Sequence, residues 1–196
     1  MAATTPALVR PTLVWVRGLL YVGAALAFIA GVQLFVLSEA TDRYFAWTIS
    51  PPLTAAFLGA AYWAGAVLAF LAAREPVWAR ARASLGAVLV FTTGALAATL
   101  LHLDRFHLDS IFGWVWLAVY VLLPPAVLLL WVLQARVPGG DPPRVAPMAP
   151  WVRAIIGVQA ALLLGVGFAF FAAPQAFAGP APAVPLWPWT LTPLTA

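Results

Sequence analysis

Long apolar runs separated by short connectors dominate the chain. Five of the runs reach the roughly 20 residues that a helix needs to cross a bilayer core. They cover residues 18–37, 53–73, 83–101, 111–133 and 154–173. Backbone groups inside a bilayer must be satisfied within their own segment, so these runs predict helices. The pattern therefore predicts an all-α integral membrane protein with about five transmembrane helices.

Two short motifs occur twice along the chain. WVR begins at Trp15, before the first run, and again at Trp151, before the fifth. The motif FAWTISPPLTA of residues 45–55 returns as WPWTLTPLTA at residues 187–196. These matches predict one four-helix repeat unit and the start of a second, parallel one. The predicted divisions are the first unit over 1–135, a cytoplasmic Pro/Gly-rich linker over 136–150, and an incomplete second unit over 151–196 with an external Pro/Trp-rich tail.

The longer repeated motif is typical of a helix start at the membrane surface. A Ser or Thr before a proline fits a helix N-cap followed by the first helical residue. A Trp one short turn earlier suits the interface between headgroups and hydrocarbon. An alternative is an anion-binding rim at the positive end of the helix dipole. The candidate interfacial residues are Trp47, Ser50, Pro51, Trp189, Thr192 and Pro193.

Composition agrees with a multi-pass membrane protein. Hydrophobic residues make up 64% of the chain and charged residues 8%, and the mean hydropathy is +0.99. The chain has no Cys, which excludes disulfides and thiolate metal sites. Its ten cations are all Arg, and they are spread over several connectors. We therefore expect no nucleic-acid partner, since such a partner requires a contiguous basic face.

The arginines predict an orientation in the membrane. Eight of them flank the ends of the runs that share one side: Arg10, Arg17, Arg74, Arg80, Arg82, Arg136, Arg144 and Arg153. The other side has only Arg43 and Arg105. The positive-inside rule then predicts a cytoplasmic N-terminus and an external C-terminus. The expected location is the inner (plasma) membrane of a bacterium.

One connector carries the residue types of a metal site. His102, Asp104, His107 and Asp109 lie within eight residues between the third and fourth runs. Imidazoles and carboxylates of this kind could bind a divalent metal, although no established metal-binding spacing is present. The competing interpretation is a polar turn at the membrane surface. No cofactor is predicted, and a divalent metal or a chlorin or haem with a single axial ligand stays open.

The apolar runs contain few polar groups and no acid or histidine. This pattern is atypical of proton-coupled transporters, which carry ionisable residues within the membrane. The polar side chains expected inside the membrane include Gln33, Tyr62, Thr92, Thr93, Thr99, Tyr120 and Gln159. The fifth run has a ridge of small residues at a spacing of four, which allows close helix packing. That ridge includes Gly157, Ala161, Gly165 and Ala169.

The segment YFAWTISPPLTAAFLGAAYW, the HLDRFH connector and the Trp-rich fourth run together carry a resemblance. Over about residues 13–135 the chain resembles uncharacterised polytopic bacterial integral membrane proteins. The resemblance implies a membrane fold and brings no substrate, activity or site residue.

The sequence leaves three functions to weigh. The favoured one is a non-catalytic subunit or scaffold, with membrane lipid around it and a protein partner or a second copy packed on the fifth helix. The first alternative is a transporter or a carrier of lipid or small ligands that opens on the outer side. The second alternative is a membrane enzyme that uses the cluster in the 102–109 connector.

Overall fold

The computed structural model describes residues 8–143 and 146–172, and helices account for most of this part of the chain. The β-type pairings in the described residues are two isolated bridges, one between Val9 and Gly140 and one between Pro11 and Val77. The helices in chain order are α1 (Val14–Gly31), η1 (Val32–Val36), η2 (Ser38–Ala40), α2 (Thr41–Tyr44), α3 (Pro52–Arg74), α4 (Trp78–Leu101), η3 (Leu103–Arg105), α5 (Ile111–Ala135) and α6 (Pro150–Ala172).

The five predicted membrane-crossing helices are confirmed. The long helices that are apolar enough to cross a bilayer are Val14–Val36, Pro52–Arg74, Trp78–Leu101, Ile111–Ala135 and Pro150–Ala169. The largest boundary difference is at α4, which begins at Trp78 and not at residue 83. Its first turns contain Arg80 and Arg82, whose guanidinium groups pair with Glu75 and Asp141 beyond the apolar span. A helix can thus extend through charged residues beyond the end of its apolar run.

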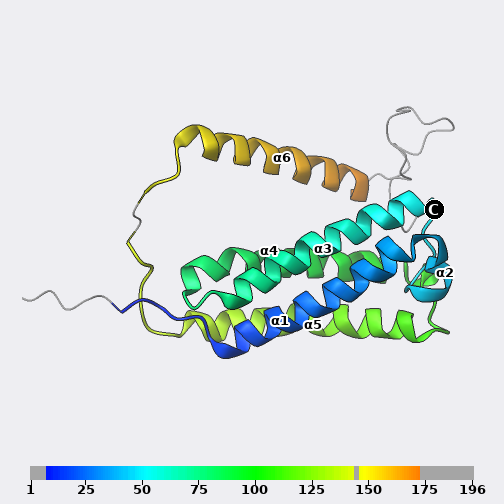
Figure 1. Ribbon diagram of the computed structural model, residues 1–196, viewed down its shortest axis with the longest axis horizontal. Helices are drawn as coiled ribbons and strands as arrows, with labels where there is room; N and C mark the ends of the chain where they lie inside the picture. The colour runs from blue at the N-terminus through cyan, green and yellow to red at the C-terminus, as the bar shows by residue number, and fades with distance from the viewer. Residues whose placement is uncertain (1–7, 144–145, 173–196) are drawn as a thin grey trace, which may run out of the picture.

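Helices α1, α3, α4 and α5 form an up-and-down bundle (Figure 1). Helix α1 packs mainly on α3 and α4 mainly on α5, while the two pairs meet less closely. Buried positions recur at spacings of three and four, as expected for helices that pack nearly antiparallel. On α3 these positions are Ala55, Gly59, Tyr62, Ala66, Ala69 and Ala73. Most are small, so the helix axes can approach each other closely.

The N-terminal end of the bundle, where α1 begins and α5 ends, is closed by the segment before α1. The Arg10 amide donates to Gly140 O at 3.0 Å, and the Thr12 amide donates to Pro76 O at 2.8 Å. The fully buried Gln134 of α5 accepts from the Leu13 amide at 2.8 Å and donates to Pro11 O at 2.9 Å. This segment therefore joins the α3–α4 connector to the chain after α5.

The opposite end of the bundle, called the aromatic end below, is built by residues 45–49 and the 102–110 connector. Trp47 is only 4% exposed and packs against Phe45, Phe106 and Trp116, with ring centroids 4.6, 5.1 and 4.8 Å away. The ring of Trp47 is therefore enclosed by protein and does not lie half in water, while its depth in the membrane stays a prediction. Its ring fills the protein interior because the connector folds over it.

The predicted cap of the second membrane helix is also displaced. Helix α3 begins at Pro52, so Pro51 occupies the N-cap position and Ser50 lies before it. The Thr54 amide donates to Pro51 O at 2.9 Å, and no side chain caps this end. The pattern placed the helix start one residue early, because either of two successive prolines can be the first helical residue. The corresponding residues of the second copy, Trp189, Thr192 and Pro193, lie outside the described residues.

Helix α6 stands apart from the bundle (Figure 1). Its membrane-crossing window has no buried residue in the protein. A Cβ added at Gly157 or Gly165 would meet no atom within 4 Å. The predicted packing ridge, which also includes Ala161 and Ala169, is thus open in this single chain, and its use for association stays a prediction. The division into repeat units stays a prediction as well.

Candidate functional site

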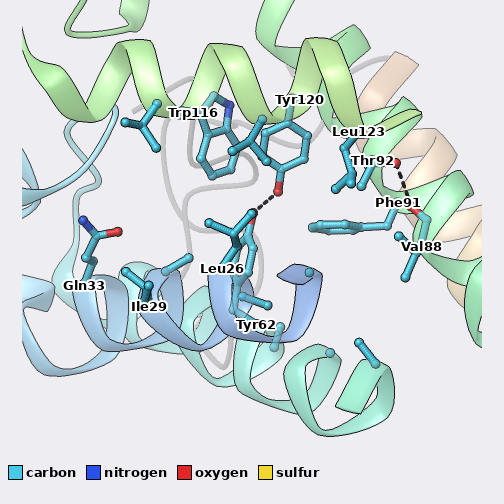
Figure 2. Close-up of a pocket in the computed structure, with 18 of the residues that line it drawn as sticks. Leu26, Ile29, Gln33, Tyr62, Val88, Phe91, Thr92, Trp116, Tyr120 and Leu123 are labelled. Atoms are coloured by element: carbon cyan, nitrogen blue, oxygen red, sulfur yellow. Dashed lines mark hydrogen bonds between the residues drawn. The ribbon is translucent and has the colours of Figure 1, made fainter. Parts of the chain in front are cut away.

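A cavity of about 440 Å³ lies inside the bundle, between the α1–α3 pair and the α4–α5 pair. Its volume falls within the roughly 300–1,000 Å³ of typical small-molecule sites. All four helices line it, and the lining is almost entirely apolar. Figure 2 shows side chains from α1, α3, α4 and α5 that point into it. Those that carry the argument below are Leu26, Tyr62, Phe91, Trp116, Tyr120 and Leu123.

The cavity exists because small residues line its α1 and α3 walls. Gly23 on α1 and Gly65 on α3 are both lining residues, and a Cβ added to either would have no atom within 4 Å. By contrast, a Cβ at Gly31 would overlap the ring of Trp63, so that glycine permits tight packing. Glycines of the same bundle therefore have two roles: some allow close contact, while others leave open volume.

Two tyrosines bridge the cavity between the helix pairs. The hydroxyls of Tyr62 on α3 and Tyr120 on α5 are 2.5 Å apart and hydrogen-bonded (Figure 2). Both side chains are buried, with 8% and 5% exposed. In an apolar interior such a bond is favourable because the alternative is an unsatisfied hydroxyl. The bond links α3 of one helix pair to α5 of the other.

Aromatic neighbours hold the two phenol rings in place. The Trp116 and Tyr120 ring centroids are 4.2 Å apart, and Phe91 packs edge-on against Tyr62 at 5.7 Å and Tyr120 at 6.4 Å. Edge-to-face and offset arrangements of this kind stabilise aromatic pairs beyond their buried area. The positions of both hydroxyl oxygens are therefore set by the packing of Trp116 and Phe91 against the two phenol rings.

Two other polar side chains at the cavity are already paired. Thr92 donates its hydroxyl to Val88 O at 2.8 Å, within its own helix. The Trp116 indole N–H donates to Thr99 Oγ1 at 3.0 Å. Gln33 also lines the cavity, but Figure 2 places it away from the tyrosine pair. The tyrosine hydroxyls are thus the polar groups at the centre of the cavity.

The cavity reaches the lipid-facing surface of the bundle. Ile29 on α1 and Val115 on α5 both line it and are about half exposed. On the α3–α4 side, Leu68 and Phe91 line it and are also about half exposed. The end toward residues 45–49 is covered by buried Phe45 and Ala46. A molecule would therefore enter sideways from the bilayer.

The residues predicted to bind metal do not gather into one site. Within the described residues, no group of three or more His, Asp or Glu side chains could hold a metal ion. Asp104 pairs with Arg105, while Asp109 is exposed. His107 instead contacts the segment after α2: its amide donates to Ala46 O at 2.8 Å, and its Nε2 lies 3.1 Å from Thr48 Oγ1. His102 is half-buried at the end of α4. Metal binding stays an unsupported prediction.

The structure joins two features that the sequence keeps separate. The 45–49 stretch and the 102–109 connector lie against each other through the His107 contacts and through Trp47 and Phe106. Tyr62 and Tyr120 occur in the sequence only as isolated polar residues within apolar runs. A signal was present: both lie on seven-residue stripes of small or buried positions, Ala55–Tyr62–Ala69 and Gly113–Tyr120–Val127. No protein-family model, curated protein or solved structure matches this chain.

Proposed function

We propose that this protein is a non-catalytic membrane protein that binds a small apolar molecule or a lipid chain in the cavity of its four-helix bundle. The cavity itself is the observation that carries the proposal, since its volume and apolar lining suit such a ligand. Its lining contains no acid, histidine, arginine or serine among the described residues. The polar side chains present, which include Tyr62 and Tyr120, can position a ligand through hydrogen bonds.

Cavity-filling substitutions test this proposal. Gly23→Leu and Gly65→Leu each place an isobutyl group into open lining space. We expect the double variant to bind a radiolabelled undecane probe roughly tenfold less tightly than the wild type. Gly94→Leu is the matched control, because Gly94 lies in α4 with nothing within 4 Å of an added Cβ and does not line the cavity.

Probe binding is measured on the purified protein in mild detergent, relative to empty micelles. Equal binding by the wild type, the double variant and the control would show that undecane does not occupy the cavity. Loss of binding in the Gly94→Leu control as well would point to a general loss of fold.

A second candidate function is supported by α6. This apolar helix has no buried residue in its membrane-crossing window, and its Gly157 and Gly165 are open to close approach. We propose that it associates with the α6 of a second copy, which makes the protein a self-associating subunit. Gly165→Leu blocks close approach without adding polarity. Crosslinking in membranes is expected to show fewer dimers for this variant, and a wild type that is monomeric under the same conditions would refute the idea.

We also propose that the N-terminal end of the bundle faces the cytoplasm. Arg10, Arg17, Arg74, Arg80, Arg82 and Arg136 all lie toward that end of the bundle, whereas Arg43 and Arg105 lie toward the other. The positive-inside rule supports this orientation. The chain has no Cys, so single Arg80→Cys and Asp109→Cys variants can be labelled in intact cells with an impermeant reagent. Label at position 109 alone is expected, and label at position 80 alone would reverse the orientation.

A further inference from the structure

The tyrosine pair at the centre of the cavity has one hydrogen more than it uses. Each phenol carries one O–H, and either oxygen can be the donor in the bond between Tyr62 and Tyr120. One hydroxyl hydrogen makes that bond, so the other is left over. Within the described residues, neither oxygen has another hydrogen-bond partner. The leftover O–H is therefore a buried donor beside an apolar cavity.

A buried donor without an acceptor is costly in an apolar environment. Backbone carbonyls of the surrounding helices already accept bonds within those helices, and among the described residues no other oxygen accepts a hydrogen bond from either phenol. The rings of Tyr62 and Tyr120 cannot swing toward water, because Trp116 and Phe91 pack against them. An acceptor brought in by a ligand would satisfy this O–H and gain a bond that bulk lipid cannot offer.

We propose that the cavity selects apolar molecules that carry one hydrogen-bond acceptor oxygen, such as a ketone or ester carbonyl, which accepts from the Tyr62–Tyr120 pair. This inference rests on the proposed function and adds the chemical class of the ligand. The apolar part would lie against Leu26 and Leu123, which flank the pair along the cavity. A plain alkane fills the same space but leaves the leftover O–H unpaired.

The pair makes an unusual prediction for single and double variants. In Tyr62→Phe the Tyr120 hydroxyl loses its partner but keeps a hydrogen to donate, and the reverse holds for Tyr120→Phe. Either single variant therefore retains a donor for the ligand oxygen. Only the double variant Tyr62→Phe/Tyr120→Phe removes both hydroxyl donors of the pair while keeping both rings. A merely structural role of the bond would instead be lost in each single variant.

The test compares two probes that differ by one oxygen, 2-undecanone and undecane. Binding of each to the full-length protein in mild detergent is measured relative to empty micelles. We expect the wild type and both single variants to prefer 2-undecanone roughly fivefold to tenfold beyond micelle partitioning. The double variant is expected to bind both probes equally. If the double variant still prefers 2-undecanone over undecane, the inference is overturned. Loss of this preference in the Gln33→Leu variant would overturn it as well.

The infrared C=O stretch of bound 2-undecanone provides a readout that needs no variant. A hydrogen bond from the phenol lowers this frequency relative to the same ketone in an alkane solvent. An unshifted band in the wild type overturns the inference even if the double variant does not fold. Equal binding of both probes by the wild type refutes only the selectivity. If neither probe binds, the proposed function fails as well.

Discussion

Helix α6 and the four bundle helices are nearly alike in apolar character but differ completely in packing. The mean hydropathy of the α6 window is 1.9, against 1.8 to 2.3 for the bundle helices. Yet none of the α6 window is buried in the protein, whereas 17% to 33% of the bundle windows are. Both have glycines, but a Cβ added to those of α6 would meet nothing within 4 Å, while one added to Gly31 or Gly59 would overlap a neighbouring helix.

The difference separates two properties that apolar composition alone cannot distinguish. Crossing a bilayer requires only length and hydrophobicity. Packing against another helix requires complementary shapes, because lipid solvates an apolar side chain as well as a protein does. The bundle helices have this complementarity through buried rings, small residues and a few hydrogen bonds. Matched substitutions in the bundle and in α6 can test whether α6 lacks such contacts.

The largest expected difference is between two tryptophans. Trp47→Ala empties a site where three aromatic rings meet, so we expect a loss of about 3–5 kcal/mol in the free energy of unfolding. Trp151→Ala in α6 removes a ring that is 66% exposed, and a change within about 0.5 kcal/mol is expected. SDS-induced unfolding in mixed micelles measures both. A similar cost at the two positions would show that Trp151 is packed in the functional state.

The sequence predicts the membrane-crossing helices well because that property depends on local composition. All five appear, with ends shifted by a few residues at Trp78 and Pro150. The grouping of arginines at one end of the bundle follows from the alternation of the helices. The spacing of small residues in the fifth run reveals a ridge on one helix face. It cannot show whether another helix covers that face.

The cavity could not be predicted in the same way, because it depends on which helix faces meet. Tyr62 and Tyr120 are 58 residues apart, on two helices that both begin at the aromatic end. Only the way the α1–α3 and α4–α5 pairs pack against each other brings their hydroxyls together. The same reason explains why the burial of Trp47 could not be predicted from the sequence. Its aromatic character suggested the membrane surface, but Phe106 and Trp116 arrive from distant segments and enclose it.

A smaller difference is expected between two glutamines that both lie in apolar helices. Gln134→Leu leaves the Leu13 amide and Pro11 O without their partner, at a cost of roughly 2–3 kcal/mol. Gln159 in α6 is exposed, so Gln159→Leu is expected to cost nothing measurable. The same unfolding assay compares them. Protease sensitivity near residues 8–13 should rise only in Gln134→Leu, and an unchanged digestion pattern there would contradict the role given to Gln134.

The smallest difference concerns two glycines. A Cβ at Gly59 would lie 2.6 Å from Phe35 N and 3.0 Å from Leu34 C, so Gly59→Ala forces α3 away from the backbone of η1. Overpacking of this kind typically costs about 1–3 kcal/mol. Gly157→Ala in α6 meets open space, and the better helix propensity of alanine predicts no loss of stability. Since both changes add one methyl group to a membrane-crossing helix, their insertion into the bilayer should be alike, and the comparison isolates packing. A loss at Gly157 that grows with protein concentration would reveal an α6 contact between copies, while a loss independent of concentration would place α6 against its own bundle.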